Sequence, residues 1–290
     1  MRRAALLLLL AAAALAGMSS LKVMPGVREA GMGDAGVAGA AGAFGIAWNP
    51  AAAADVRGFA ASASYAKWLL DSHQQSLFLV RDFSLFRAGF GVTGFTAGAF
   101  EYRSDVPTEE PLGDFVPGEF SFRVTVARRF GIVDAGISAR YYYSKVMADA
   151  ANGPGVDAGV RVAPVEGLAF GASLTDFGRN LVYYYESFRL PTRARAGAVY
   201  RLPLGGRNRL ELAGEGGYYV YTKTFNVHGG AEFLWNELLA LRAGCEWLDG
   251  PVRPGFGLGL LAGRLRFDYS FTLLNDDLGA AHRFALGLGG

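Results

Sequence analysis

The chain has 290 residues, of which 51% are hydrophobic and 19% charged, with a formal net charge of +2. Such a hydrophobic content excludes an intrinsically disordered chain, which would contain fewer apolar residues and more net charge. The near-neutral charge, without a basic cluster, argues against nucleic acid as a partner. The single cysteine, Cys245, excludes an intrachain disulfide framework and a cysteine-rich zinc site.

The first residues have the three parts of a secretory signal peptide. Met1–Arg3 is a basic start, Ala4–Ala13 is an apolar stretch, and Ala14–Ala16 is a cleavage signal. We expect residues 1–16 to be removed, which leaves Gly17 as the first mature residue. A buried N-terminal helix is the weaker interpretation. The sequence therefore predicts an exported protein.

Most of the remaining chain alternates apolar and polar residues with a period of two, the pattern of half-buried strands. Near the end, for example, Leu265, Phe267 and Tyr269 share one face, and Arg266 and Asp268 share the other. Such segments recur about fourteen times. They lie near residues 58–68, 74–81, 87–97, 120–127, 132–146, 155–163, 168–176, 193–202, 209–221, 225–235, 238–247, 254–262, 264–273 and 283–289.

Alternation alone would also fit a soluble β-sandwich. Two features favour a membrane barrel. The segments are about ten residues long, the length that a tilted strand needs to cross a bilayer. Aromatic residues gather at segment ends, as in the interfacial girdles of such barrels. They are Trp48, Trp68, Tyr141–Tyr143, Tyr183–Tyr185, Tyr218–Tyr221, Trp235 and Trp247.

Most connections between segments also alternate in length, as expected when tight turns face the periplasm and longer loops face outward. Two depart from the rule: the outward connection Thr222–Thr224 is short, and the periplasmic connection Leu202–Asn208 is rather long. The tight connections are Gly131, Pro164–Gly167, Asn236–Glu237 and Gly263. The longer ones are Gly98–Gly118, Met147–Pro154, Phe177–Pro191, Leu248–Arg253 and Leu274–Ala281. The prediction is an all-β fold: a transmembrane antiparallel β-barrel of about fourteen strands over residues 57–290.

Charged residues occupy the face of the strands that would line the lumen. The strongest candidates for lumen-facing side chains are Arg123, Arg140, Arg193, Arg195, Glu211, Glu215, Arg266 and Asp268. Their signs are mixed, which favours a network of ion pairs that stiffens the wall. A selectivity filter would instead need a ring of one sign at one depth.

The segment before the first strand, residues 17–56, is expected to fill the lumen as a plug. Nearly every side chain between residues 31 and 54 is small, as a chain threaded through a crowded interior requires. Asn49 and Pro50 are a turn or helix-start signal, because asparagine caps free amides and proline is favoured at the first helical position.

Two short motifs resemble a known family. Gly31-Met32-Gly33 and Trp48-Asn49-Pro50, followed by alanine, resemble the N-terminal signature of the PorV/PorQ group of outer-membrane barrels. That group is similar to the FadL-type channels for hydrophobic compounds, whose N-terminal hatch carries a comparable Asn-Pro-Ala. Residues 267–271 and 282–284 also resemble the final hairpin of the group. The resemblance implies a fourteen-stranded barrel in the outer membrane of a diderm bacterium, with both termini periplasmic.

Catalysis has little support in the sequence. The three histidines, His73, His228 and His282, lack metal-ligand spacing, and His228 with Asn226 is the only catalytic candidate on a wall strand. We interpret it as a lumen residue. We therefore expect no enzyme, cofactor or metal site.

Two function classes stay open. The first is a plugged channel for hydrophobic or small solutes. The alternative is a non-transporting accessory barrel that docks a secretion apparatus, as in type IX secretion, or exported cargo. The expected partners are outer-membrane lipid, and either a hydrophobic small molecule or secretion-machinery proteins.

Overall fold

The structure of the protein is a computed structural model that describes residues 18–103, 109–147, 149–183, 186–248, 250, 252–274 and 278–289. The predicted signal peptide and Gly17 lie outside the described residues. Within the described part of the chain, no helix has the length and apolar composition needed to cross a membrane.

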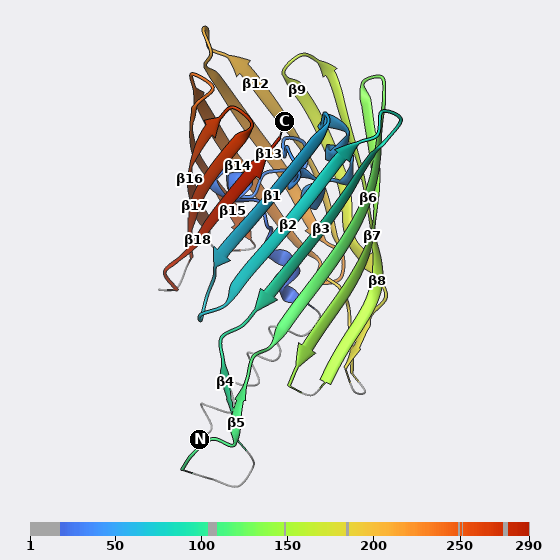
Figure 1. Cartoon of the computed structure of the whole chain (residues 1–290), viewed down its shortest axis with the longest axis vertical. Coiled ribbons are helices and arrows are strands. Elements are labelled where there is room, and N and C mark those ends of the chain that lie inside the picture. Colours follow the sequence, from blue (N-terminus) through green and yellow to red (C-terminus); the bar gives the residue numbers. More distant parts are fainter. Residues whose placement is uncertain are drawn as a thin grey trace.

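Fourteen antiparallel strands form a closed barrel in which each strand pairs with two neighbours (Figure 1). The first strand, β1, pairs with the last, β18, and closes the ring. The strands are β1 (Phe59–Lys67), β2 (His73–Asp82), β3 (Arg87–Thr96), β6 (Gly118–Phe130), β7 (Val133–Val146), β8 (Asp149–Val165), β9 (Leu168–Gly178), β12 (Arg193–Pro203), β13 (Arg209–Tyr219), β14 (Thr224–Trp235), β15 (Leu239–Leu248), β16 (Val252–Ala262), β17 (Leu265–Leu273) and β18 (Ala280–Leu288). The predicted all-β barrel of about fourteen strands is confirmed.

The two ends of the barrel differ. At the turn end, connections such as the one around Gly131 are tight; at the loop end, two connections carry hairpins of their own. One hairpin consists of β4 (Phe100–Tyr102) and β5 (Gly113–Phe115), and it projects well beyond the barrel (Figure 1). The other consists of β10 (Leu181–Tyr183) and β11 (Glu186–Phe188).

One predicted long connection, Met147–Pro154, is wrong. Strand β7 runs to Val146 and β8 begins at Asp149, so most of this stretch is paired strand. The residues that pair with β7 here include Ala150 and Gly153. A methyl group and a missing side chain give no hydrophobic alternation. Similarly, β16 already begins at Val252, which shortens the predicted loop Leu248–Arg253.

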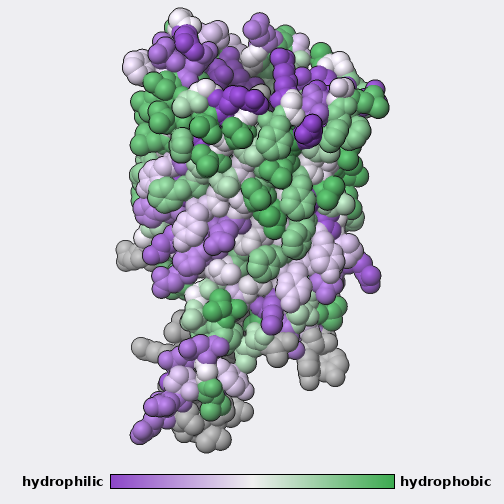
Figure 2. Space-filling view, viewed as in Figure 1, coloured by the Kyte–Doolittle hydropathy of each residue, from purple (hydrophilic) through white to green (hydrophobic). Residues whose placement is uncertain are grey.

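The outer face of the barrel is apolar. On β6, for example, Phe120, Phe122, Val124 and Val126 are exposed, whereas the alternate residues are buried inside. Figure 2 shows this as a mainly hydrophobic band between two more hydrophilic ends. A barrel with this surface can lie in a bilayer because all backbone groups of its wall pair within the ring.

The predicted aromatic girdle is only partly correct, and two of its members, Tyr184 and Tyr185, lie outside the described residues. Trp235 and Trp247 are exposed on the outer face, but Trp48 and Tyr142 are fully buried inside the barrel. The reason is strand parity: Tyr142 occupies an inward position of β7 between two outward ones, and Trp48 precedes the first strand altogether.

Residues 18–56, which we call the luminal segment, lie inside the ring of strands (Figure 1). They form four short helices: η1 (Ser19–Lys22), α2 (Val27–Gly31), α3 (Gly45–Trp48) and η2 (Pro50–Asp55). Met18 packs against Tyr142 and Leu181 at the loop end, and Asp55 contacts Arg129 at the turn end. The segment therefore runs the length of the lumen. Its first described residue is at the opposite end from the periplasmic position that the resemblance implied.

Candidate functional site: the lumen and its occupant

Glycines in the wall let the backbone of the luminal segment approach the strands directly. A Cβ atom at Gly244 would lie 2.2 Å from the carbonyl carbon of Met32, and one at Gly255 would lie 2.5 Å from the Ala30 oxygen. Both distances are impossible for real atoms, so any side chain at these wall positions would displace the segment. The wall glycines thus fit an occupied lumen.

Glycines of the segment itself are equally constrained. A Cβ atom at Gly31 would lie 3.0 Å from the Gly257 Cα atom, and one at Gly33 would lie 2.4 Å from the carbonyl oxygen of Cys245. Gly33 also has a φ angle of +69°, a backbone conformation that residues with a side chain rarely adopt. Backbone packs on backbone here, which brings Gly31-Met32-Gly33 against β15 and β16.

Trp48 fixes the fold of the luminal segment. Its ring covers Gly26 and Gly36, where a Cβ atom would lie within 2.6 Å of the indole. Its Nε1 atom donates a hydrogen bond of 3.3 Å to the carbonyl oxygen of Asp34. One buried indole therefore holds together two distant parts of the segment.

Asn49 joins the segment to the wall. Its Nδ2 atom donates to the carbonyl oxygens of Val37 (3.0 Å), Val160 on β8 (3.1 Å) and Ala172 on β9 (3.3 Å). Its Oδ1 atom accepts from the Ala51 amide at 3.0 Å and so caps η2, with Pro50 in the first helical turn. One buried amide therefore bonds to the segment and to two strands.

Buried ion pairs fill the lumen on the side of β12–β17. Arg28 of α2 contacts Glu211 at 2.5 Å and Glu232 at 3.0 Å. Arg242 contacts Glu232 at 2.7 Å and Asp268 at 2.8 Å. Since each of these charges has an opposite partner, the network stiffens the interior and offers no ring of one sign.

A second network lies toward the loop end. Arg140 contacts Asp157 at 3.0 Å and Asp176 at 3.2 Å, and Arg123 contacts Asp157 at 3.2 Å. Arg123 also donates to the carbonyl oxygen of Ile46 in α3. This network therefore ties β6–β9 to the luminal segment.

The eight side chains selected from sequence all belong to inward positions of the wall. Arg123, Arg140, Arg193, Arg195, Glu211 and Glu215 are buried, and Arg266 and Asp268 form a 2.7 Å ion pair. Glu215 accepts hydrogen bonds from the Gly36 and Val37 amides. Sequence reasoning missed the charges that the segment contributes, namely Arg28, Glu29 and Asp55. Their position flanking the stretch of small residues was the available signal.

The remaining side of the lumen has a different character. Between the turn-end pair of Asp82 and Arg87 and the loop end, the inward residues of β1–β3 are uncharged: Ala60, Ser62, Ser64, Ala66, Gln74, Ser76, Phe78, Val80, Gly89, Gly91, Thr93 and Phe95. Phe44, Ile46 and Ala47 of the segment pack here against Phe78 and Val80. The segment thus has a charged side and an apolar side, each facing a matching wall.

An apolar pocket opens at the loop end of this uncharged wall. It measures about 270 Å³ and lies between Trp68–Leu70, Phe95 and Phe100. It shares Ser20, Val23 and Phe95 with a smaller cavity of about 30 Å³ inside the barrel. This cavity is lined by apolar residues such as Met24 and Phe78 and, on the side of β6–β9, by the charged residues Glu119, Arg123, Arg140 and Asp176. Toward the turn end, the apolar cluster of Phe44, Ile46, Phe78 and Val80 fills the lumen on this side.

Asp55 anchors the segment at the turn end. Its carboxylate contacts Arg161 at 2.5 Å and also pairs with Arg129. Burial alone would raise the pKa of Asp55, but the charges of Arg161 and Arg129 hold it below its ordinary value. The carboxylate is therefore ionised at neutral pH and ties the segment to β6 and β8.

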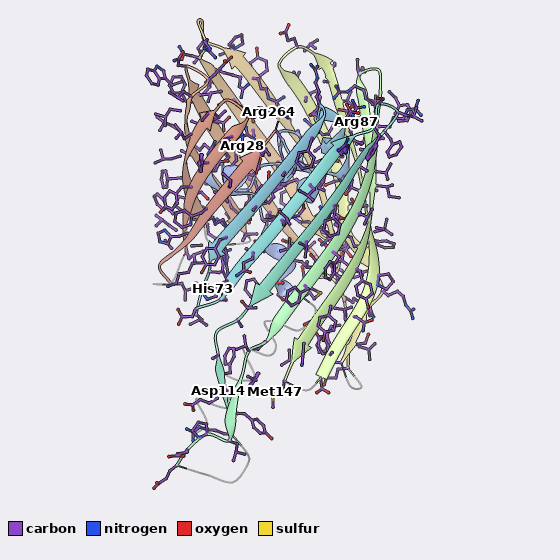
Figure 3. All side chains as sticks on the ribbon, in the orientation of Figure 1. Arg28, His73, Arg87, Asp114, Met147 and Arg264 are labelled. Atoms are coloured by element: carbon purple, nitrogen blue, oxygen red, sulfur yellow. The ribbon has the colours of Figure 1, made fainter. Side chains whose placement is uncertain are left out.

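No arrangement for catalysis is found in the described residues. His228 contacts the Gly33 carbonyl oxygen through Nδ1 at 2.8 Å, and its Nε2 atom contacts Asn226 at 3.0 Å. His73 and His282 lie on the outer face (Figure 3 labels His73). Among these residues, no three His, Cys, Asp or Glu side chains are grouped to hold a metal ion, and Cys245 is exposed.

Comparisons with known proteins reveal relatives in structure. No family model and no curated protein matches the sequence. A crystal structure of the Pseudomonas putida toluene transporter TodX matches with a TM-score of 0.67 and 11% identity, over 91% of this chain and 98% of that one. The CymD monoaromatic hydrocarbon channel matches with a TM-score of 0.61 and 12% identity, over 92% and 96%. A Pseudomonas aeruginosa FadL homologue matches with 0.57 and 12%, over 91% and 97%. The chain therefore has the FadL-type fold.

Proposed function

We propose that the protein is an outer-membrane channel for hydrophobic compounds, closed by its luminal segment. The observation that carries the proposal is the uncharged wall of β1–β3, which begins at the apolar pocket between Trp68 and Phe100. The predicted signal peptide, which would export the chain, and the apolar outer face support the location.

The division of the lumen explains which solutes could pass. A path along β1–β3 would expose a solute to uncharged side chains, some apolar and some small and polar, so a hydrophobic molecule would meet no charge from this wall. On the opposite side, paired charges such as Arg242 with Asp268 lie between the wall and the segment. Opening therefore requires movement of the apolar side of the segment, around Phe44 and Ile46, while its charged side can stay bound.

The test is uptake in a diderm host that lacks its own channel of this fold. Toluene, the compound named for one structural relative, serves as the probe. We expect cells expressing the protein to take up toluene faster than cells with an empty vector, without a general leak to large antibiotics. Equal uptake in the two strains would overturn the proposal.

A second candidate function is an accessory barrel that docks secretion proteins, as the PorV/PorQ resemblance implied. The hairpin β4–β5 favours it, because this hairpin projects from the loop end with Phe100 stacked on Phe115 and is suited to contact a second protein. Copurification from native membranes, with and without replacement of residues 102–113 by a short glycine linker, tests this candidate, because this change keeps Phe100 of the pocket. Loss of a specific partner with unchanged toluene uptake would support docking.

A further inference from the structure

A hollow of about 640 Å³ lies on the outer face of the barrel, across β1 and β15–β18. It exists because β1 carries a small residue, Ala63, beside larger neighbours on both sides. Ala63 lies opposite Leu77 of β2 and Leu286 of β18. The hollow opens on the β18 side, where Leu286 lines it together with Ala63.

Strand register shows how the hollow is built. One row across the strands consists of Tyr65, Phe284, Tyr269 and Leu258. The next row toward the turn end consists of Ala63, Leu286, Phe267, Leu260 and Leu239. Apart from the two tyrosine hydroxyls, these side chains are apolar, so the floor and rims of the hollow suit a hydrocarbon chain.

On β2, β1 and β18, the next row toward the loop end consists of His73, Lys67 and His282, which we call the basic row. Lys67 lies directly opposite both His73 on β2 and His282 on β18. The Nδ1 atom of His73 is 3.0 Å from the Tyr65 hydroxyl, and that of His282 is 2.9 Å from the Tyr269 hydroxyl. When the tyrosine donates this bond, Nε2 carries the ring proton and is available to donate to a ligand.

Among the described residues, the acidic partner of this row is Asp71. Asp71 approaches Lys67 at 3.9 Å, but the Asp71 side chain is 85% exposed and that of Lys67 is 58% exposed. A pair this open to water contributes little, so the Lys67 ammonium can exchange Asp71 for a stronger anion. The basic row therefore has three donors above a hydrocarbon-sized space.

We propose that this surface is a binding site for a phosphate-bearing lipid of the leaflet at the loop end. One acyl chain fills the hollow beside Ala63, and the phosphate accepts from Lys67 and from His73 and His282. The inference rests on the membrane location proposed above but not on transport. Tyrosine rings at the boundary place the basic row at headgroup depth.

The test uses the full-length protein in a non-ionic detergent, with bound lipid counted by native mass spectrometry. Dimyristoyl phosphatidic acid supplies a phosphate head, and dimyristoyl phosphatidylcholine has the same chains with a zwitterionic head. We expect the first phosphatidic acid to bind roughly three- to fivefold more tightly, the size of one partly exposed charged contact. Equal binding of both lipids to the wild type would overturn the proposal.

Two variants separate the parts of the site, each with a matched control. Ala63→Phe fills the hollow and should weaken both lipids, whereas Ala172→Phe, on the outer face of β9, should not. Lys67→Gln should remove the preference for phosphatidic acid, whereas Lys145→Gln, at the loop end of β7, should keep it. Equal losses in a variant and its control would mean nonspecific lipid. Because this measurement needs no transport, failure of toluene uptake leaves its outcome unaffected.

Discussion

The side-chain amide of Asn49 occupies the space that a Cβ atom at Gly159 would fill. Such an atom would lie 2.0 Å from the Asn49 Oδ1 atom and 3.0 Å from the Pro50 Cδ atom. A buried polar side chain of the luminal segment and a missing side chain in strand β8 are therefore complementary. This pairing makes the junction between segment and wall specific to these two residue types.

Replacing Asn49 by aspartate should release this junction. Aspartate keeps the shape but, when ionised, cannot donate to the carbonyl oxygens of Val37, Val160 and Ala172. Leaving such buried groups unpaired should destabilise the segment by roughly 1–3 kcal/mol. Hydrogen exchange of residues 45–55 measures the loss. The exposed Asn152→Asp change on β8 is the control, and equal effects of the two would contradict the prediction.

Gly244→Ala should expel the luminal segment while the barrel persists. The new methyl group would collide with the Met32 backbone, and overpacking of this kind costs about 1–3 kcal/mol. Trypsin should then cut after Arg28, which is buried in the wild type, while migration in detergent gels stays heat-modifiable. Gly214→Ala, where a Cβ atom meets nothing within 4 Å, is the control. If trypsin still did not cut after Arg28 in Gly244→Ala, the close contact between Gly244 and Met32 would not be what keeps the segment in place.

Arg28→Met should be far more damaging than loss of a surface ion pair. It removes the cation between Glu211 and Glu232, which keep Arg201 and Arg242 as partners. The cost should lie below the roughly 3–5 kcal/mol of a buried charge left without any partner, but above that of a surface pair. The matched control is Arg207→Met, which breaks an exposed pair with Glu237 and should cost about 0–1 kcal/mol. Urea unfolding in detergent compares them. Similar midpoints for both variants would argue against a structural role of the network.

A charge in the uncharged wall should slow passage of hydrophobic solutes. Ser76→Asp places a carboxylate beside Thr93 in the lumen, whereas Gln75→Asp places it on the outer face of the same strand. We expect toluene uptake to fall in the first variant and to stay near wild type in the second. Equal uptake by Ser76→Asp and wild type would move the path away from β1–β3.

The Asp55 anchor should respond to acid but not to mildly acidic conditions. The pKa of Asp55 in the folded state is held below its ordinary value of 3.8. At pH values between the two, the folded state therefore binds fewer protons at this carboxylate than the unfolded state does. Its stabilising contribution is therefore complete above the ordinary carboxyl pKa and is lost as pH falls through the lowered one. Hydrogen-exchange protection of residues 50–56 should be higher in the wild type than in Asp55→Asn. This difference should be the same at about pH 8 and pH 5, and it should shrink below about pH 4. A difference that vanishes by pH 5 would refute the assignment.

Alternation allowed the wall to be predicted from sequence because each strand has one lipid face and one lumen face. The rule failed at Asp149–Pro154, where alanine and glycine give no contrast between the faces. It also failed for Trp48, whose environment depends on the fold of the luminal segment. Strand β8 (Asp149–Val165) is consequently longer than the segment 155–163 that the apolar alternation predicted.

The contents of the lumen were predictable only in part. Inward charges such as Arg123 and Glu211 follow from strand parity, but their partners do not. Arg28 meets Glu211 and Glu232 across separations of 183 and 204 residues, and no local pattern encodes such a contact. The outer hollow beside Ala63 was equally hidden, because it depends on the register of β1 against β18.

The closed ring and the course of the luminal segment together constrain biogenesis. The segment is joined to β1 at the turn end and reaches the loop end at Met18, and a ring of hydrogen bonds has no side entrance. Its backbone also lies against wall glycines that leave no room for a side chain to slide past. One possible order is that β18 pairs with β1 when the luminal segment already lies between the strands. In the other order, the segment enters through one end of the barrel before the wall packs against it. In either order, the pairing of β1 with β18 is completed only around a luminal segment that is correctly placed.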